Sequence, residues 1–325
     1  MNRGFVLGVD GGGTKTHLAL ATSDGCLRAM VAGKGTNLES QKPAVIIGIL
    51  SGLLARACKM AGVERCAVRA SCFAMSGVDI HEDIPYARKI ITSGLGLSGP
   101  IKIHNDAFIA LFNDGWRDSG AVVTVGTGHK WLAVGRKREF MHDGLVFPGL
   151  HDLALEELLK VAEGYTEPSA FSRRMFRRFG FSSPEDFIRR WRYGGSREYV
   201  KPISAPALKR LIRIKEFVGS DAQSGDPVAR SLVTRYAGFL AEGVQVAVRQ
   251  AGESGRGLTV VMSGSVLAGI ISLRSAFIRR LTALIPGAVA GPARFRPIRG
   301  ALVYAAHQAW GDMPPDALTE KVLRY

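Results

Sequence analysis

Hydrophobic and polar positions near the N-terminus alternate as in two strands joined by a tight turn. An apolar run over residues 5–9 ends at Asp10, and a second alternating run leaves the turn over residues 15–21. Three glycines and a threonine, residues 11–14, separate the two runs. This pattern predicts a strand, a glycine turn and a strand. Glycines at these positions permit positive φ and let a ligand approach the backbone closely.

The same pattern occurs a second time in the chain. An apolar run over residues 121–125 leads into Gly126, Thr127 and Gly128, and a further apolar run follows over residues 131–134. Internal repetition of this kind is a signal of the whole fold rather than of one loop. It predicts two similar sheets whose glycine turns face each other across a cleft.

The remaining chain predicts further strands and helices. In the first half we expect strands over residues 27–32, 68–75 and 101–104, and helices over residues 43–62, 82–94 and 107–116. In the second half we expect a mostly helical region over residues 150–219, helices over residues 228–252 and 297–310, and a strand over residues 258–262 that turns into a helix at residues 263–265. Polar residues follow the strands of the first half, where open α/β sheets bind their ligands.

Composition is that of a globular protein with one unusual feature. The 325 residues are 46% hydrophobic and 22% charged, enough for two domains with cores of their own. The net charge is +15, and basic residues far outnumber acidic ones over residues 173–215. Such a segment is either a nucleic-acid or membrane-surface patch or a solvated, arginine-rich helical surface. No zinc-finger or RNA-binding signature accompanies it, so we expect neither a specific nucleic-acid partner nor a membrane.

The cysteines give no sign of a metal site or a disulfide framework. Cys26, Cys58, Cys66 and Cys72 form no CxxC pair and no cluster with histidine at metal-ligand spacing. The sequence leads straight into its first strand without a secretory signal. We therefore expect free thiols and a cytoplasmic protein.

The first glycine turn is a candidate phosphate site, although it is not a P-loop. Gly8 to Gly13 has the spacing GxxxxG, but Thr14-Lys15 follows where a P-loop has Lys and then Ser or Thr. A P-loop also opens a helix, whereas this turn opens an alternating strand. Exposed N–H groups in a turn can bind an anion, and Asp10 can hold Mg²⁺ beside it. The motif therefore favours the polyphosphate of a nucleotide over its alternative, an ordinary glycine-rich hairpin.

Five short motifs in order resemble those of a known family. They are Asp10-Gly-Gly-Gly-Thr14, Asn105-Asp106-Ala107, Gly126-Thr127-Gly128, Gly225-Asp226-Pro227-Val228-Ala229 and Ser263-Gly264-Ser265. The set resembles the BadF/BadG/BcrA/BcrD ATPase family, in its N-acetylglucosamine kinase-like branch within the sugar kinase, actin and Hsp70 superfamily. The resemblance implies an α/β fold of two ribonuclease-H-like (actin-like ATPase) domains around a central nucleotide cleft. Their expected bounds are 1–116 and 117–325, with a helical insertion around 150–220 in the second.

The resemblance also implies an activity and a set of site residues. The activity is ATP-dependent phosphorylation of a small sugar, above all an amino sugar such as N-acetylglucosamine or glucosamine, with ATP and Mg²⁺ as cofactors. Asp106 matches the catalytic base, whose alternative role is a simple helix N-cap, and Asp10 matches the metal-positioning carboxylate. The implied nucleotide- and phosphate-binding residues are Asp10, Gly11, Gly12, Gly13, Thr14, Lys15, Gly126, Thr127, Gly128, Gly264 and Ser265. The implied sugar-binding residues are Asn37, Ser76, Gly77, Asn105, Asp106 and Gly144.

The sequence departs from this branch at the sugar site. The branch carries Gly-Asp-Glu-Gly-Ser after its second hairpin, whereas this chain has Gly149-Leu150-His151-Asp152-Leu153. Asp143 or Asp152 could replace the missing carboxylate, and Arg299 is bulkier than the small residue usual before Gly300. The alternative function is therefore a BadF/BadG-type ATPase or a nucleotide-binding regulator without sugar kinase activity. The expected partners are ATP and a small-molecule sugar, with a possible homodimer.

Overall fold

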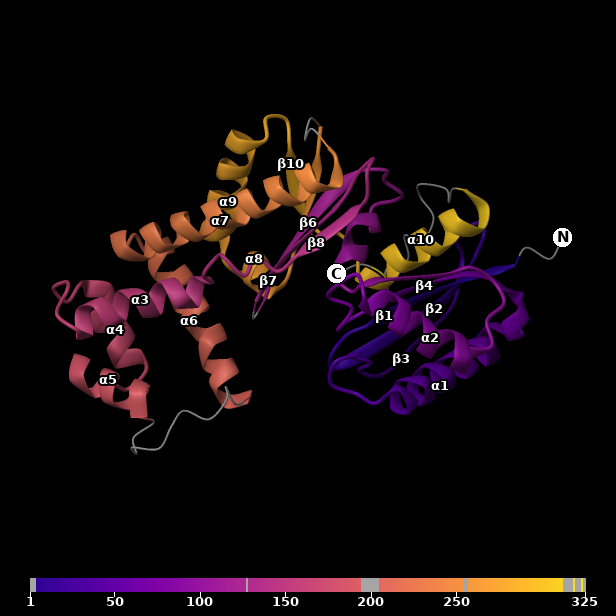
Figure 1. Ribbon diagram of the computed structural model, residues 1–325, viewed down its shortest axis with the longest axis horizontal. Coiled ribbons are helices and arrows are strands. Elements are labelled where there is room, and N and C mark those ends of the chain that lie inside the picture. The colour runs from indigo at the N-terminus through magenta and orange to yellow at the C-terminus, as the bar shows by residue number, and fades with distance from the viewer. Residues whose placement is uncertain are drawn as a thin grey trace.

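The computed structural model describes residues 4–126, 128–193, 205–253 and 257–311, together with Leu318 and Leu323. Thr127, which the sequence assigns to the second glycine turn, lies outside the described residues, as does part of the basic segment. Figure 1 shows the two halves of the chain, each built around a sheet.

The first sheet contains five strands in the order β3-β2-β1-β4-β5. The strands are β1 (Phe5–Gly11), β2 (Lys15–Thr22), β3 (Leu27–Lys34), β4 (Val68–Met75) and β5 (Ile101–Asn105). The first three form an antiparallel meander, while β1, β4 and β5 run parallel. The carboxyl ends of these three parallel strands therefore lie at one edge of the sheet.

The second sheet repeats this topology in the order β10-β9-β6-β7-β8. Its strands are β6 (Gly120–Val125), β7 (His129–Val134), β8 (Glu139–His142), β9 (Thr259–Ser263) and β10 (Val289–Pro292). Again three strands form an antiparallel meander and two more extend it in parallel. The structure thus confirms the duplicated sheet predicted from the two glycine turns. The hydrophobic pattern missed β8 and β10, which are short and largely half-buried.

Helices cover both faces of the first sheet. On one face lie α1 (Pro43–Ala61) and α2 (Asp83–Leu95), whose buried residues pack on Leu7, Val9 and Leu18. By length and composition α1 is apolar enough to cross a membrane, but here its buried residues belong to this core. The other face carries α10 (Pro297–Trp310), which packs on β1 and β4. The chain therefore returns to its first sheet after completing the second. The predicted division into 1–116 and 117–325 instead groups α10 with the second half.

The second sheet carries a larger set of helices. They are α3 (Leu150–Ala162), α4 (Ala170–Arg178), α5 (Pro184–Tyr193), α6 (Ala205–Gln223), α7 (Pro227–Ala251), α8 (Ser265–Gly269) and α9 (Ile271–Leu284). The long helix α7 packs on α9 and on the meander strands, and α3 to α6 extend away from the sheet (Figure 1). Asp226 caps α7 by accepting a hydrogen bond of 2.9 Å from the Ala229 N–H, with Pro227 in the first turn, as predicted.

The predicted helix over residues 107–116 is wrong. Only a 3-10 helix, η2 (Phe108–Phe112), forms there, and all five of its residues are buried. These residues belong to a core cluster that also contains residues of α10 and of both sheets, such as Val6 and Val122. Packing against these distant segments, rather than the local preference for a helix, therefore determines the backbone here.

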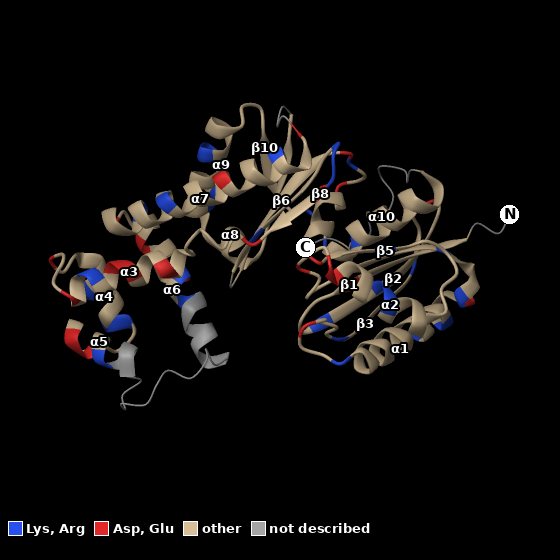
Figure 2. Cartoon of the chain, viewed as in Figure 1, with Lys and Arg blue, Asp and Glu red and all other residues tan. Residues whose placement is uncertain are grey.

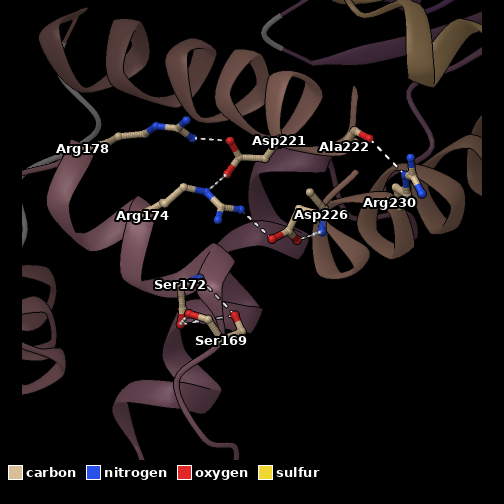
Figure 3. Close-up of polar contacts among 9 residues, drawn as sticks. Ser169, Ser172, Arg174, Arg178, Asp221, Ala222, Asp226 and Arg230 are labelled. Carbon is tan, nitrogen blue, oxygen red and sulfur yellow. Dashed lines mark hydrogen bonds and ion pairs between the residues drawn. The ribbon is translucent and has the colours of Figure 1, made fainter. Parts of the chain in front are cut away.

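The arginine-rich segment uses some of its charge inside the fold. Arg174 of α4 pairs with Asp221 at 3.1 Å and with Asp226 at 2.5 Å, and Arg178 pairs with Asp221 at 2.8 Å (Figure 3). Both signs of charge occur along α3 and α5, whereas the charged residues of α4 are all arginines (Figure 2). At these two arginines the structure favours a packed helical surface over a free nucleic-acid patch.

Candidate functional site

Strand register brings the predicted site residues of the first half to one edge. Gly11 lies opposite Met75, and Met75 lies opposite Asn105. The segments that leave β1, β4 and β5 therefore start side by side, and they carry the first glycine turn, Ser76 and Asp106. This arrangement follows from the parallel pairing of three strands, whose carboxyl ends must share an edge.

The loop after β3 packs against the first glycine turn. The Gly12 N–H donates to the Lys15 carbonyl oxygen, and the Thr36 N–H donates to the Gly12 carbonyl oxygen, each at 3.0 Å. A Cβ at Gly11 would lie 2.4 Å from Thr36 Oγ1, so that position has no room for a side chain. None of Gly11, Gly12 or Gly13 has a positive φ, so this turn does not use the conformational freedom that glycine permits. Close packing, rather than φ, requires glycine at position 11.

Asp10 lies at the base of this turn. It is half-buried, and its Oδ2 is 3.7 Å from Nδ1 of His17, its register partner on β2. The exposed tip of the turn consists of Gly13, Thr14 and Lys15. Among the residues that the structure describes, no group of three or more His, Cys, Asp or Glu side chains could hold a metal ion. A single carboxylate suits Mg²⁺, which commonly keeps water and phosphate oxygens as its other ligands.

The second glycine turn occupies the equivalent position in the other sheet. The Gly126 N–H donates to the Gly128 carbonyl oxygen at 2.9 Å. Lys215 of α6 contacts this turn, since its Nζ donates a hydrogen bond of 2.7 Å to the Gly126 carbonyl oxygen. The Lys215 side chain is fully buried, and burial lowers its pKa to about 8. The sequence pattern does not single out Lys215, because it is one basic residue among many in its segment.

A cavity of about 610 Å³ lies between loops of the two halves. Six of the predicted site residues line it: Ser76, Asn105, Asp106, Gly126, Gly128 and Gly144. Asn37 supports the cavity wall, since its Nδ2 donates to Ser76 Oγ at 3.0 Å. Gly77 has φ +82°, and a Cβ there would lie 2.9 Å from the Glu39 nitrogen. Position 77 therefore requires glycine for the tight packing of these two loops.

Asp106 is the most strongly perturbed carboxyl group in this cavity. Burial, together with the negative charges of Asp10 and Asp79, raises the pKa of Asp106 to about 6, while Lys130 and the Ala107 N–H act in the opposite direction. The predicted alternative role as a helix N-cap is wrong, because Ala107 is the N-cap of η2. A half-buried carboxyl group with a raised pKa at the lining of a cavity is a candidate general base.

Asn105 fixes the backbone that carries Asp106. Its Oδ1 accepts the Ala107 N–H at 2.9 Å, while its Nδ2 donates to the Val78 carbonyl oxygen at 3.0 Å and to Asp79 Oδ1 at 2.8 Å. Asn105 is itself buried. It therefore joins the loop after β4 to the loop after β5, which carries the candidate base.

Asp79 and Lys130 also belong to this site, although the sequence motifs do not include them. Lys130 of β7 forms an ion pair with Asp79 and a second one, of 3.2 Å, with Asp143. Burial lowers the pKa of Lys130, but the contacts with Asp79 and Asp143 raise it more, so the side chain remains charged. The one available signal was position, since Lys130 follows the Gly-Thr-Gly turn almost directly.

The loop that departs from the sugar kinase pattern also reaches the cavity. Asp152 Oδ2 accepts the Gly149 N–H at 2.8 Å and so closes the first turn of α3. His151 Nε2 lies 3.3 Å from Asp152 Oδ1, and burial lowers the pKa of His151. The two carboxylates expected as replacements therefore both line the cavity with partners of their own, Asp143 with Lys130 and Asp152 with the α3 backbone.

Gly264 and Ser265 line a separate cavity of about 450 Å³. Gly264 has φ +89°, and a Cβ there would lie 2.3 Å from the Val125 carbonyl oxygen, next to the second glycine turn. Register explains this proximity, because Thr124 on β6 pairs with Ser263 on β9. Arg299 does not contribute to either cavity lining. It is buried, donates from Nε to the Leu318 carbonyl oxygen at 2.9 Å, and lies over the Phe295 ring.

The comparisons with known proteins agree with this geometry. Residues 7–142 match the model of the BadF/BadG/BcrA/BcrD ATPase family. The chain is 33% identical over 137 residues to the N-acetylmuramic acid/N-acetylglucosamine kinase of Clostridium acetobutylicum, a match that spans 42% of this chain and 43% of that relative. It is 24% identical over 272 residues to the N-acetyl-D-glucosamine kinase of Dictyostelium discoideum, covering 78% and 82% of the two chains.

A solved structure with a similar fold is that of a candidate N-acetylglucosamine kinase from Chromobacterium violaceum. It has a TM-score of 0.63 and 21% identity, and the match covers 93% of this chain and 99% of that one. The chain thus shares with that structure an α/β fold built on two five-stranded sheets. The motifs of the first half that carry the expected resemblance lie within residues 7–142, the part of the chain that matches this family model.

Proposed function

We propose that the protein transfers the γ-phosphoryl group of ATP to a hydroxyl group of a small amino sugar of the N-acetylglucosamine or glucosamine class. The observation that carries the proposal is the position of Asp106, a half-buried carboxyl group with a pKa raised to about 6 that lines a cavity of about 610 Å³ between the two halves. That cavity also contains Gly126 and Gly128 of one glycine turn.

In this proposal the residues of the chain divide the work of phosphoryl transfer. Asp106 accepts the proton of the attacking sugar hydroxyl, and the turns at residues 11–14 and 126–128 bind the phosphates through backbone N–H groups. Mg²⁺, when bound, neutralises phosphate charge, and Asp10 is the residue that would hold it. Such catalysis needs positioning and charge neutralisation more than covalent chemistry.

The second cavity is the proposed binding site for the adenosine of ATP. Gly264 and Ser265 line the 450 Å³ cavity, and Gly264 packs against the strand that leads into Gly126. Adenosine bound in that cavity would have its phosphates directed toward the second glycine turn. This arrangement supports the expected nucleotide roles of Gly264 and Ser265.

The relatives favour a kinase over an ATPase without a sugar substrate. Both curated relatives are named as kinases of N-acetylated amino sugars, and one of them matches most of this chain. The cavity also offers the carboxylate and amide groups of Asp79, Asn105 and Asp143 to sugar hydroxyls. A cytoplasmic location and a homodimer stay predictions.

The test is a coupled ADP-release assay with Mg-ATP and a panel of amino sugars, hexoses and anhydro-sugars. We expect one amino sugar to stimulate ADP release and Asp106→Asn to lose that stimulation while still binding ATP. If no sugar stimulates ADP release from protein that binds ATP, the proposal fails and the ATPase or regulator alternative is favoured.

A further inference from the structure

A lysine from the second sheet lies between two carboxylates that come from different halves of the protein. Asp79 belongs to the loop after β4, and Asp143 follows β8. Lys130 of β7 pairs with both, and all three side chains line the cavity of about 610 Å³. Of the described residues that line this cavity, Lys130 is the one lysine or arginine.

The contacts of Lys130 continue to the candidate base. Asp79 Oδ1, which pairs with Lys130, also accepts a hydrogen bond of 2.8 Å from Asn105 Nδ2. Asn105 in turn holds the Ala107 N–H, directly beyond Asp106. A single polar network therefore connects β7 of one sheet to the backbone around Asp106 in the other.

We propose that Lys130 is a positioning residue of the sugar site: it fixes Asp79 and Asp143, one from each half of the protein, as acceptors of hydrogen bonds from sugar hydroxyls, and it holds the loop that carries Asp106. The inference rests on the proposed sugar kinase function, because it assigns the walls of that site. A carboxylate that is held in place by a lysine still has free lone pairs. It can therefore accept hydrogen bonds from the hydroxyl groups of a sugar in the cavity.

The charge of Lys130 also acts on Asp106. The charged groups that face Asp106 are Asp10 from β1, Asp79 from the loop after β4, and Lys130 from β7. Removal of Lys130 would take away the one positive charge in this set and leave the charge of Asp79 unbalanced. The pKa of Asp106 would then rise further, so the acid limb of the kcat profile would move to higher pH.

The fold provides a matched control for a purely structural effect. Lys102 of β5 lies 3.5 Å from Glu139 of β8, so it also joins the first sheet to the second. The exposed fractions of these two side chains are 33% and 32%, and neither residue lines the cavity. Lys102→Met therefore removes an ion pair between the halves without touching the sugar site.

The experiment compares Lys130→Met, Lys130→Arg and Lys102→Met with the unmodified protein, using the amino sugar that the panel identifies. We expect Lys130→Met to raise the sugar KM on the order of tenfold, because the site loses charge-assisted hydrogen bonds. The KM for ATP should stay unchanged, and the acid limb of kcat, measured over roughly pH 5 to 9, should move to higher pH. Lys130→Arg should keep the sugar KM and the acid limb close to those of the unmodified protein. Lys102→Met should change neither the sugar KM nor the acid limb.

An unchanged sugar KM and acid limb in Lys130→Met would overturn the inference. The same changes in Lys102→Met would also overturn it, because loss of any ion pair between the halves would then be enough to produce them. A carbon-13 NMR titration of the Asp106 carboxyl group separates this inference from the proposed function, since it needs no sugar. A higher pKa in Lys130→Met than in the unmodified protein supports the charge effect, and an equal pKa contradicts it, whether or not a sugar is phosphorylated.

Discussion

Lys215 Nζ lies 2.7 Å from the carbonyl oxygen of Gly126, so a lysine of the helical region supports the second glycine turn from behind. The lysine side chain is fully buried, and its pKa is lowered to about 8. Below that pH the side chain carries a positive charge next to a turn to which we assign the phosphates of ATP. The helical region therefore contacts the second glycine turn directly and is not merely appended to the sheet.

Lys215→Met should raise the KM for ATP while leaving the fold intact. Methionine has a similar length but neither the donor nor the charge. In the unmodified protein the KM for ATP should rise as the pH increases through about 8, because Lys215 loses its proton there, and the variant should lack that step. Lys160→Met is the control, since Lys160 lies on α3 and pairs with Glu156 at the surface. An ATP KM equal to that of the unmodified protein would contradict the role of Lys215.

The raised pKa of Asp106 predicts the pH dependence of turnover. A general base must be unprotonated to accept a proton, and Asp106 is increasingly protonated below about pH 6. With saturating substrates, kcat should therefore fall as the pH drops through that region and reach a plateau above it. A steady-state pH series measures this directly. A profile that stays flat from well below about pH 6 upward would exclude Asp106 as the base.

Asp10→Asn should weaken binding of Mg-ATP more than binding of ATP alone. The amide keeps the shape of the side chain but loses the negative charge that would hold Mg²⁺. Titration calorimetry with ATP, in the presence of Mg²⁺ and then of a chelator, measures both affinities. Equal losses under the two conditions would mean that Asp10 acts on the turn itself, and no loss would remove its assigned role.

Gly300→Ala should destabilise the contact between α10 and η2. A Cβ at position 300 would lie 2.1 Å from the Ile109 carbonyl oxygen, and the Gly300 N–H donates to Asn113 Oδ1 at 3.0 Å. We expect the free energy of unfolding to fall by about 1–3 kcal/mol, because backbone has to move.

Gly238→Ala in α7 provides the opposite case in the same chemical denaturation experiment. A Cβ at Gly238 would have no neighbour within 4 Å. This substitution should raise the free energy of unfolding by up to about 1 kcal/mol, since alanine favours a helix over glycine. Equal stability of the two variants would show that the close approach at Gly300 can be relieved.

The repeated sheet could be predicted from the sequence because its signals are local. Each glycine turn stands between two alternating runs, and such a unit needs only its own residues to be recognised. The positions of Ser76, Asn105 and Asp106 at one edge followed from the parallel strands that precede them. The short strands β8 and β10 were missed because four residues are too few to establish a pattern.

Features that depend on contacts between distant segments could not be predicted. Lys130 and Asp79 form an ion pair because loops of the two halves come together in the fold. No local sequence pattern around either residue indicates the other as its partner. The helix expected over residues 107–116 failed for a related reason, since η2 is enclosed by α10 and by both sheets. Local propensity favoured a helix there, but packing against segments far along the chain decided the outcome.

The most direct test of the proposed kinase activity is detection of the phosphorylated sugar itself. Phosphorus NMR and mass spectrometry would follow Mg-ATP and N-acetylglucosamine or glucosamine in the presence of the protein and of Asp106→Asn. We predict a sugar phosphate formed in step with ADP, and a loss on the order of 10²–10⁴-fold in Asp106→Asn. Release of ADP with inorganic phosphate and no sugar phosphate would contradict the kinase account and identify the protein as an ATPase.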